Sequence, residues 1–183
     1  YYTLQNVGLA YTSATSGTLI LAIIPAATAL FAMWLLGERL QARQIAGIAI
    51  AVAGTAFVAL MTGSNQDAPN PLLGNLLIAG SVVAWVIYTI QGKRLNAAYP
   101  AIVTTTASIG TGLLMMLPFG IAEVWQSGLP HLSRDGGLAI FYLGVIATAL
   151  PMFLWNYALQ HLDASVASLY LNLVPIVGVL LAV

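Results

Sequence analysis

The sequence predicts an all-α, polytopic membrane protein with an inverted internal repeat. Three observations support this prediction: a nearly uncharged composition, a series of apolar segments long enough to cross a bilayer, and a match between the two ends of the chain. Of the 183 residues, 60% are hydrophobic and 5% are charged, and five Lys/Arg balance five Asp/Glu. Soluble domains carry about 25% charged residues. This composition excludes a soluble globular domain, and also a nucleic-acid binder, which needs a basic face.

Apolar, uncharged segments follow one another along the whole chain. A helix needs about 20 mostly apolar residues to cross the hydrocarbon core, and helix is expected because lipid-exposed backbone must satisfy its own hydrogen bonds. The expected spans are a partial one at 1–9, full ones at 16–36, 44–61, 72–90, 102–122 and 138–159, and an incomplete one at 166–183. Both ends lie in apolar sequence without flanking anchors, so we expect a fragment of a longer protein, truncated at both ends.

The charges predict how the chain is oriented in the membrane. All ten charged residues lie between the spans or at their edges: Glu38, Arg39, Arg43, Asp67, Lys93, Arg94, Glu123, Arg134, Asp135 and Asp163. Four of the five positive charges fall in two breaks that two spans separate, and therefore on one side. Cytoplasmic loops carry the excess of Lys and Arg. We therefore expect a multi-pass protein of the cell (inner) membrane whose loops with Glu38, Lys93 and Asp163 are cytoplasmic.

The two ends of the chain match each other without gaps at an offset of 150 residues, with nine identities in the first 33 positions. The match pairs Asn6 with Asn156 and Pro25 with Pro175. Helices rich in Leu and Ala also match by chance, but a paired Asn and a paired Pro favour a true repeat. The spans with the two prolines are five helices apart, an odd number, so the second copy crosses the membrane in the opposite direction. Inverted repeats characterise secondary transporters.

Two segments also resemble a known family. The run from Tyr11 to Leu40, with its turn Gly37-Glu38-Arg39, resembles the first repeat of the EamA family in the drug/metabolite transporter superfamily. The run from Tyr142 to Pro175 is similar to the second repeat. The resemblance implies a bundle of two inverted five-helix repeats, of which this chain supplies the third to the ninth helix. It divides the chain into the C-terminal part of the first repeat, 1–62, an inter-repeat loop, 63–71, and a second repeat lacking its last helix, 72–183.

The resemblance implies a secondary transporter, an exporter of small metabolites such as amino acids or related compounds, that works by alternating access. The expected partners are a small-molecule substrate, the lipid bilayer and a second copy of the chain in a homodimer, without nucleic acid. An intramembrane enzyme and a channel-like or structural membrane protein are the alternatives. The sequence contains no HExxH, GxSxG or P-loop motif, so we expect no catalytic residue, metal or cofactor. No Asp, Glu or His lies inside a span, which favours transport without proton coupling.

Polar and aromatic side chains inside spans predict a substrate pathway, because such residues usually face a bundle interior or a cavity. Its candidate residues are Tyr2, Asn6, Ser81, Trp85, Tyr88, Thr148, Met152, Trp155, Ser168 and Asn172. Hydrogen bonding between packed helices is the alternative for the Ser and Thr residues. An aromatic belt at the membrane interface is the alternative for the Trp and Tyr residues.

Four further residues are predicted to shape the bundle. Pro25 and Pro175 are expected to kink their spans, either as gates or as static bends. Glu38 and Arg39 are expected to form a cytoplasmic turn that ties neighbouring helix ends together. Gly47, with Gly54 and the alanines between them, predicts close approach of another helix, within the bundle or at a dimer face.

Overall fold

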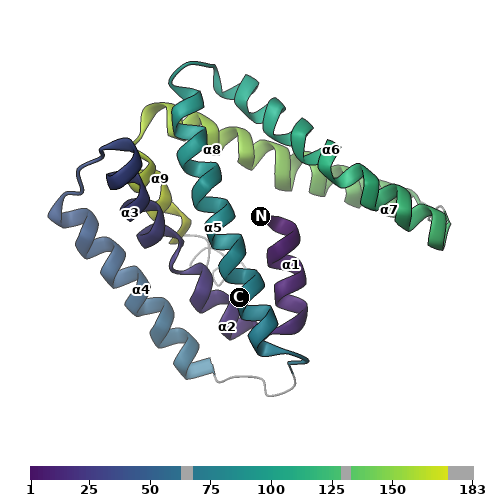
Figure 1. The fold of residues 1–183 in the computed structure, drawn as a ribbon, viewed down its shortest axis with the longest axis horizontal. Coiled ribbons are helices and arrows are strands. Elements are labelled where there is room, and N and C mark those ends of the chain that lie inside the picture. The colour runs from purple at the N-terminus through teal and green to yellow at the C-terminus, as the bar shows by residue number, and fades with distance from the viewer. Residues whose placement is uncertain (63–67, 129–132, 173–183) are drawn as a thin grey trace. The chain divides into compact units, whose positions relative to one another are not determined.

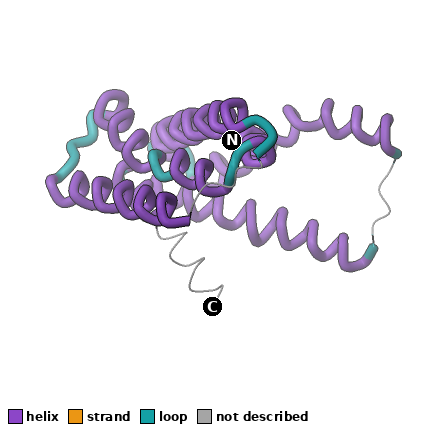
Figure 2. The backbone as a smooth tube through the Cα atoms, turned by 90° about the horizontal axis from the view of Figure 1, so that it is seen from below, coloured by secondary structure: helices purple, strands orange, loops and turns teal. Residues whose placement is uncertain are grey.

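The computed structural model describes residues 1–62, 68–128 and 133–172. All regular structure in these ranges is helical, and they contain no strand (Figure 2). Four of the helices found there are long and apolar enough to cross a membrane: Ala14–Leu36, Pro71–Asn96, Ala101–Gln126 and Arg134–His161. These helices confirm the predicted all-α membrane protein. The predicted inter-repeat loop and last span, 63–71 and 166–183, lie partly outside the described residues.

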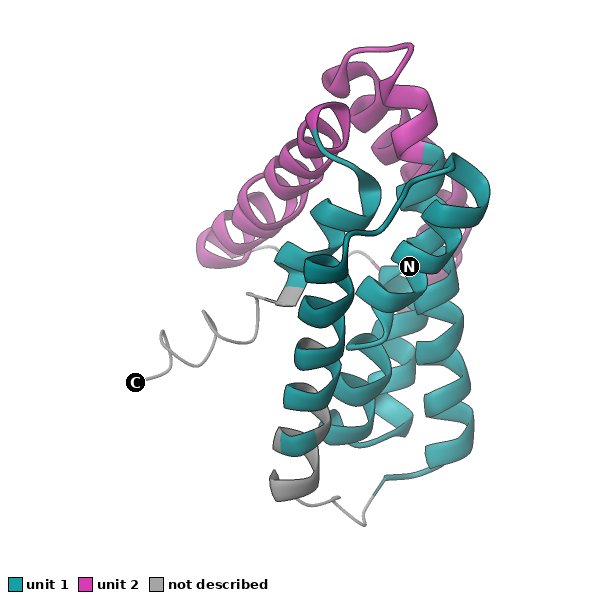
Figure 3. Ribbon diagram, turned by 90° about the vertical axis from the view of Figure 1, so that its left-hand side faces the viewer, with its two compact units in different colours: residues 1–91, 162–183 teal, residues 92–161 magenta. Residues whose placement is uncertain are grey.

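The chain forms two compact units (Figure 3), one of residues 1–91 with residues from 162 onward, and the other of residues 92–161. The first unit begins with α1 (Tyr2–Tyr11), α2 (Ala14–Leu21), α3 (Ile24–Leu36) and α4 (Ala42–Thr62), which are labelled in Figure 1. It also contains most of α5 (Pro71–Asn96), then α9 (Ala164–Leu169) and a short 3₁₀ turn, η2 (Tyr170–Asn172).

Helix α1 packs closely against α5 because glycines face each other. A Cβ added at Gly74 would lie 2.7 Å from the Thr12 backbone nitrogen and 2.8 Å from the Gly8 carbonyl oxygen. The Thr12 hydroxyl donates a hydrogen bond of 2.7 Å to Asn75 Oδ1 across the same contact. By contrast, a Cβ added at Gly47 or Gly54 meets no described atom within 4 Å apart from the neighbouring backbone of its own helix. The close approach predicted there is therefore not seen within the described part of the bundle.

The span around Pro25 is interrupted. Helix α2 ends at Leu21, and α3 begins at Ile24 with Pro25 in its first turn, where a missing N–H costs least. Between the two helices the Ile23 amide donates to the Ile20 carbonyl at 3.2 Å, a tighter i−3 bond. Helix α3 ends at Gly37, whose φ of 71° is the left-handed conformation that glycine adopts at little cost. Pro175 lies outside the described residues.

The second unit contains the end of α5, then α6 (Ala101–Ser127) packed against a long helix made of α7 (Arg134–Phe141), a π-helical stretch η1 (Tyr142–Ala149) and α8 (Leu150–His161). The wide turns of η1 directly precede Pro151, whose ring would clash with the i−4 carbonyl in a regular α-helix. The Thr148 hydroxyl donates to the Leu143 carbonyl, five residues earlier, at 2.7 Å. We attribute the wider turns to the proline, which they accommodate without ending the helix.

Candidate functional site

Three predicted pathway residues come together in the first unit. The ring centroid of Trp85 lies 5.6 Å from that of Tyr88 and 4.8 Å from that of Tyr1, which in turn lies 5.0 Å from Tyr2. Trp85 is buried, Tyr88 is half-buried and Tyr2 is 45% exposed. We call Tyr1, Tyr2, Trp85 and Tyr88 the aromatic cluster. Aromatic faces of this kind can bind cations and apolar groups.

The cluster is positioned by the antiparallel contact of α1 with α5. Moving back along α1, Thr12 bonds to Asn75, Gly8 lies on Ile78, and the Leu4 side chain approaches Gly80. The next step places Tyr1 on Trp85. Trp85 and Tyr88 share one face of α5 because they are three residues apart. The register of the glycine contact therefore fixes which rings meet.

The predicted serines bond within their own helices. Ser81 is fully buried, and its hydroxyl donates to the Ile78 carbonyl at 2.7 Å. Ser168 is also fully buried and donates to the Ser165 carbonyl at 2.8 Å. These bonds fit the packing alternative better than a pathway, because the hydroxyl hydrogens are already used. Asn6 is exposed on α1, and the side chain of Asn172 lies outside the described part.

The remaining pathway candidates lie in the second unit, near the π-helical stretch. Thr148, Met152 and Trp155 are all half-buried and lie at i, i+4 and i+7 along the long helix. The Thr148 hydroxyl donates to its own helix. Met152 and Trp155 therefore offer mainly apolar and aromatic surface in this unit.

A buried polar network in the second unit was missed by the sequence analysis. Asn156 is fully buried, and its Nδ2 donates to Thr105 Oγ1 at 3.1 Å and to the Met152 carbonyl at 3.0 Å. Its Oδ1 accepts from Asn96 Nδ2 at 3.0 Å. The network joins α5, α6 and α8. The presence of Asn156 inside an apolar span could have predicted this network, since a buried Asn side chain is energetically costly unless it is hydrogen-bonded.

Side chains also tie helix ends together in this unit. Lys93 Nζ donates to the Leu159 carbonyl at 3.0 Å, and Gln160 Nε2 donates to the Tyr99 carbonyl at 3.0 Å. Carbonyls near helix C-termini lack intrahelical partners. These two side chains satisfy such groups near the end of α8 and beyond the end of α5.

In the first unit the Glu38 carboxylate contacts the start of α9. It accepts from the Ala164 amide at 2.7 Å, the Ser165 amide at 3.0 Å and the Ser165 hydroxyl at 2.6 Å. Arg39, the neighbour in the predicted turn, is exposed. Glu38 therefore joins the C-terminal end of α3 to the N-terminal end of α9.

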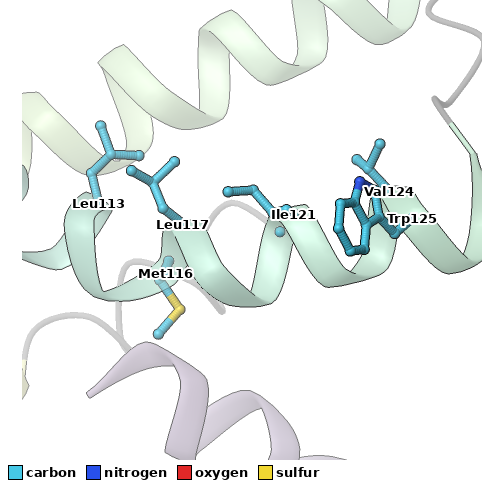
Figure 4. A pocket seen from close by; sticks show the side chains of 7 residues that line it. Leu113, Met116, Leu117, Ile121, Val124 and Trp125 are labelled. Carbon is cyan, nitrogen blue, oxygen red and sulfur yellow. The ribbon is translucent and has the colours of Figure 1, made fainter.

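A shallow groove of about 510 Å³ lies on α6 (Figure 4), and unlike the contacts described above it is lined by apolar side chains. Its lining residues all come from that one helix: Leu113, Met116, Leu117, Gly120, Ile121, Val124 and Trp125. Its walls are apolar, so it offers almost nothing that could orient a polar substrate. The described residues also contain no group of three or more His, Cys, Asp or Glu side chains that could hold a metal ion.

Comparison with known proteins gives the family. The model of the EamA-like transporter family matches residues 1–60 and 72–183. The chain belongs to this family. Among its relatives, the uncharacterized transporter YetK of Bacillus subtilis is 26% identical over 96% of this chain and 53% of its own length. A probable terminal-alkyne amino-acid exporter of Streptantibioticus cattleyicolor is 30% identical over 100% of this chain and 59% of its own.

The chain is shorter than these EamA-like proteins and spans between half and two thirds of their length. The inner membrane transporter YedA of Escherichia coli, for example, matches 88% of this chain but only 51% of its own length, at 27% identity. A solved crystal structure covers 99% of this chain and 63% of its own, with a TM-score of 0.79 and 22% identity. That likeness establishes a shared fold.

Proposed function

We propose that the protein containing this chain is a secondary transporter that exports amino acids or related small metabolites by alternating access between two inverted repeats. Family membership supports transport, and the relative named as an amino-acid exporter supports the substrate class. The repeats are those expected above, with 1–62 and 72–183 on either side of the loop 63–71.

The contacts at the two ends of the first unit support the inversion. The Asn70 amide donates to the Tyr11 carbonyl at 3.2 Å, just before α2 begins. At the far end of α3, Glu38 bonds to the start of α9. Helix α9 therefore begins where α3 ends and runs back toward the other end. The match at an offset of 150 pairs the start of α9 with the start of α2, and these two helices run in opposite directions, as an inverted repeat requires.

The aromatic cluster carries the proposed substrate site. A zwitterionic amino acid has an ammonium group that can lie over an aromatic face, which strengthens binding by about 0.5–2 kcal/mol. Tyr2 and Tyr88 are the members of the cluster that offer such a face, because Tyr2 is exposed, Tyr88 is half-buried and Trp85 is buried. The rings of Tyr1 and Tyr88 both contact the ring of Trp85 and would contact the apolar part of the substrate. In the second unit, Met152 and Trp155 are the candidates for further contacts. No charged side chain of this chain lies within a predicted span, which suits a substrate without net charge.

The protein is proposed to lie in the cell (inner) membrane, with the loops of Glu38, Lys93 and Asp163 in the cytoplasm. We propose α4, which carries Gly47 and Gly54, as the face of a homodimer. Small residues allow helices to approach closely in lipid.

Uptake of a panel of radiolabelled amino acids into proteoliposomes with the full-length protein tests the proposal. Trp85→Ala is expected to lower transport about fivefold or more, because it removes the ring against which Tyr1 and Tyr88 pack, an aromatic contact worth about 1 kcal/mol. Trp85→Phe keeps an aromatic face and should retain most of the activity. Trp125→Ala is the matched control, because Trp125 is 87% exposed on α6. Folded Trp85→Ala protein that transports at the normal rate would contradict this site, and strong stimulation by a pH gradient would contradict uncoupled transport.

A further inference from the structure

Helix α9 has a local capping residue that it does not use. Asp163 is the N-cap residue of α9, with the extended backbone typical of that position, φ −61° and ψ 146°. Aspartate is among the best N-cap residues, because its carboxylate accepts the free amides of the first turn. The Asp163 side chain nevertheless makes no capping hydrogen bond and is exposed.

Glu38 takes this role from more than 120 positions away. Its two carboxylate oxygens accept the amides of Ala164 and Ser165 at 2.7 and 3.0 Å, and the Ser165 hydroxyl at 2.6 Å. Hydrogen bonds to a carboxylate are stronger than neutral ones, and a negative charge is favoured at a helix N-terminus. Two carboxylates can therefore serve one helix end, and the distant one is bonded.

Helices α3 and α9 pack against each other beside this tie. The buried residues where these two helices pack include the small side chains of Ala29, Ala32, Ala164 and Ala167, each at most 2% exposed. Small side chains interlock little when one helix moves against another. Among the described residues, the Glu38 bonds are the side-chain hydrogen bonds that join α3 to α9 at this end, so their loss would remove a directional constraint on it.

We propose that Glu38 and Asp163 form an exchange cap, a conformational latch on this side of the transporter. The inference rests on the proposed alternating access, because α3 and α9 then belong to different repeats that move relative to each other. In the latched state Glu38 caps α9. When the end of α3 moves away, the Asp163 carboxylate turns onto the amides of its own first turn. The helix end stays capped in both states, which keeps their free energies close.

Distances between two spin labels test this exchange without any substrate. The labels are placed at Arg39→Cys and Leu162→Cys, two exposed positions beside the cap, in the full-length protein in liposomes. This chain contains no native Cys, and any Cys in the rest of the full-length protein is first replaced by Ser, so that only the two introduced positions take up label. Glu38→Gln weakens the latched state and should raise the ratio of long to short distances about fivefold, the shift that one lost cap of about 1 kcal/mol produces.

Asp163→Ala should do the opposite and lower the same ratio about fivefold. It removes the cap of the open state only, because Asp163 makes no cap bond in the latched one. The double variant should return close to the original ratio. Glu123→Gln and Asp135→Ala, exposed carboxylates of the other unit, are the matched controls and should leave the ratio unchanged.

Two outcomes would overturn the exchange cap. Unchanged distances in the Glu38→Gln protein would mean that the Glu38 hydrogen bonds do not stabilise the latched state. An Asp163→Ala ratio that is unchanged, or that moves in the same direction as with Glu38→Gln, would mean that Glu38 is a static brace. Opposite shifts in a protein that transports no amino acid would support the latch and contradict the proposed substrate instead.

Discussion

The Asn156 carboxamide lies fully buried between α5, α6 and α8, with bonds to Thr105 and Asn96. Asn156→Ala would remove the amide that donates to the buried Thr105 hydroxyl and one of the two oxygens to which Asn96 Nδ2 donates, the other being the Asn156 backbone carbonyl. Such a loss costs about 1–3 kcal/mol. We expect a clear fall in the melting temperature of the detergent-solubilised full-length protein, measured by a size-exclusion thermal stability assay. Gln91→Ala, which removes an exposed amide from α5, is the control and should melt like the unmodified protein. Equal melting of Asn156→Ala would show that the network does not stabilise the fold.

Sequence reasoning reaches some of these contacts and not others. That Trp85 and Tyr88 share a helix face follows from their spacing, and their ring contact agrees with it, whereas their role in a substrate pathway stays a prediction. The partners of Asn156 could not be predicted, because they lie 51 and 60 positions away. Ser81 and Ser168 looked equally suited to a pathway, yet their hydroxyls bond to their own helices. Only the three-dimensional contacts separate these cases.

At the scale of helices, the contact of α1 with α5 depends on Gly74. A methyl group there would lie 2.7 Å from the Thr12 amide nitrogen, so the backbone of α1 must move. Gly74→Ala is expected to destabilise the protein by about 1–3 kcal/mol, as overpacking does, and to weaken transport by displacing Tyr1 from Trp85. Thermal stability and transport are both measured.

The matched control for that helix contact is Gly112→Ala. A Cβ at Gly112 on α6 meets no described atom within 4 Å, so this variant should keep its stability or gain slightly from the better helix propensity of alanine. A Gly74→Ala protein as stable and active as Gly112→Ala would contradict the close packing of α1 on α5.

The apolar segments of the sequence predict where the helices lie, but they do not predict where the helices end. The segment expected at 72–90 is part of α5, which continues to Asn96, and the segment expected at 102–122 is part of α6, which continues to Ser127. Hydropathy identifies the part of a helix that lies in the hydrocarbon core, whereas the helix itself continues into the polar interface. The π-helical stretch before Pro151 also escaped prediction, because an apolar surface on every side leaves no periodicity from which a wider turn could be detected.

At the scale of the whole molecule, composition alone predicted the fold class, because ten charges cannot cover a soluble protein of this size. The orientation of the chain in the membrane is predicted from weaker evidence, the distribution of five positive charges. The structure adds contacts at each end of the first unit, Tyr11 with Asn70 and Glu38 with Ala164. These place the starts of α2 and α9 at opposite ends of that unit.

Labelling of single cysteines in intact cells tests both the inversion and the orientation. Ala14 and Leu162 are exposed and lie at the starts of the two helices that the repeat pairs. Tyr99 is exposed in the turn before α6, and Gln126 is exposed near the C-terminal end of α6. A membrane-impermeant maleimide should reach cysteines at Ala14 and Gln126 from outside, since four of the five positive charges lie on the other side. Cysteines at Leu162 and Tyr99 should react only after permeabilisation. Reaction of Ala14→Cys and Leu162→Cys from the same side would mean that the two copies are parallel, and that rocking of inverted repeats is not how this protein works. If Leu162→Cys and Tyr99→Cys reacted from outside and Ala14→Cys and Gln126→Cys only after permeabilisation, the repeats would still be inverted, but the predicted orientation would be wrong.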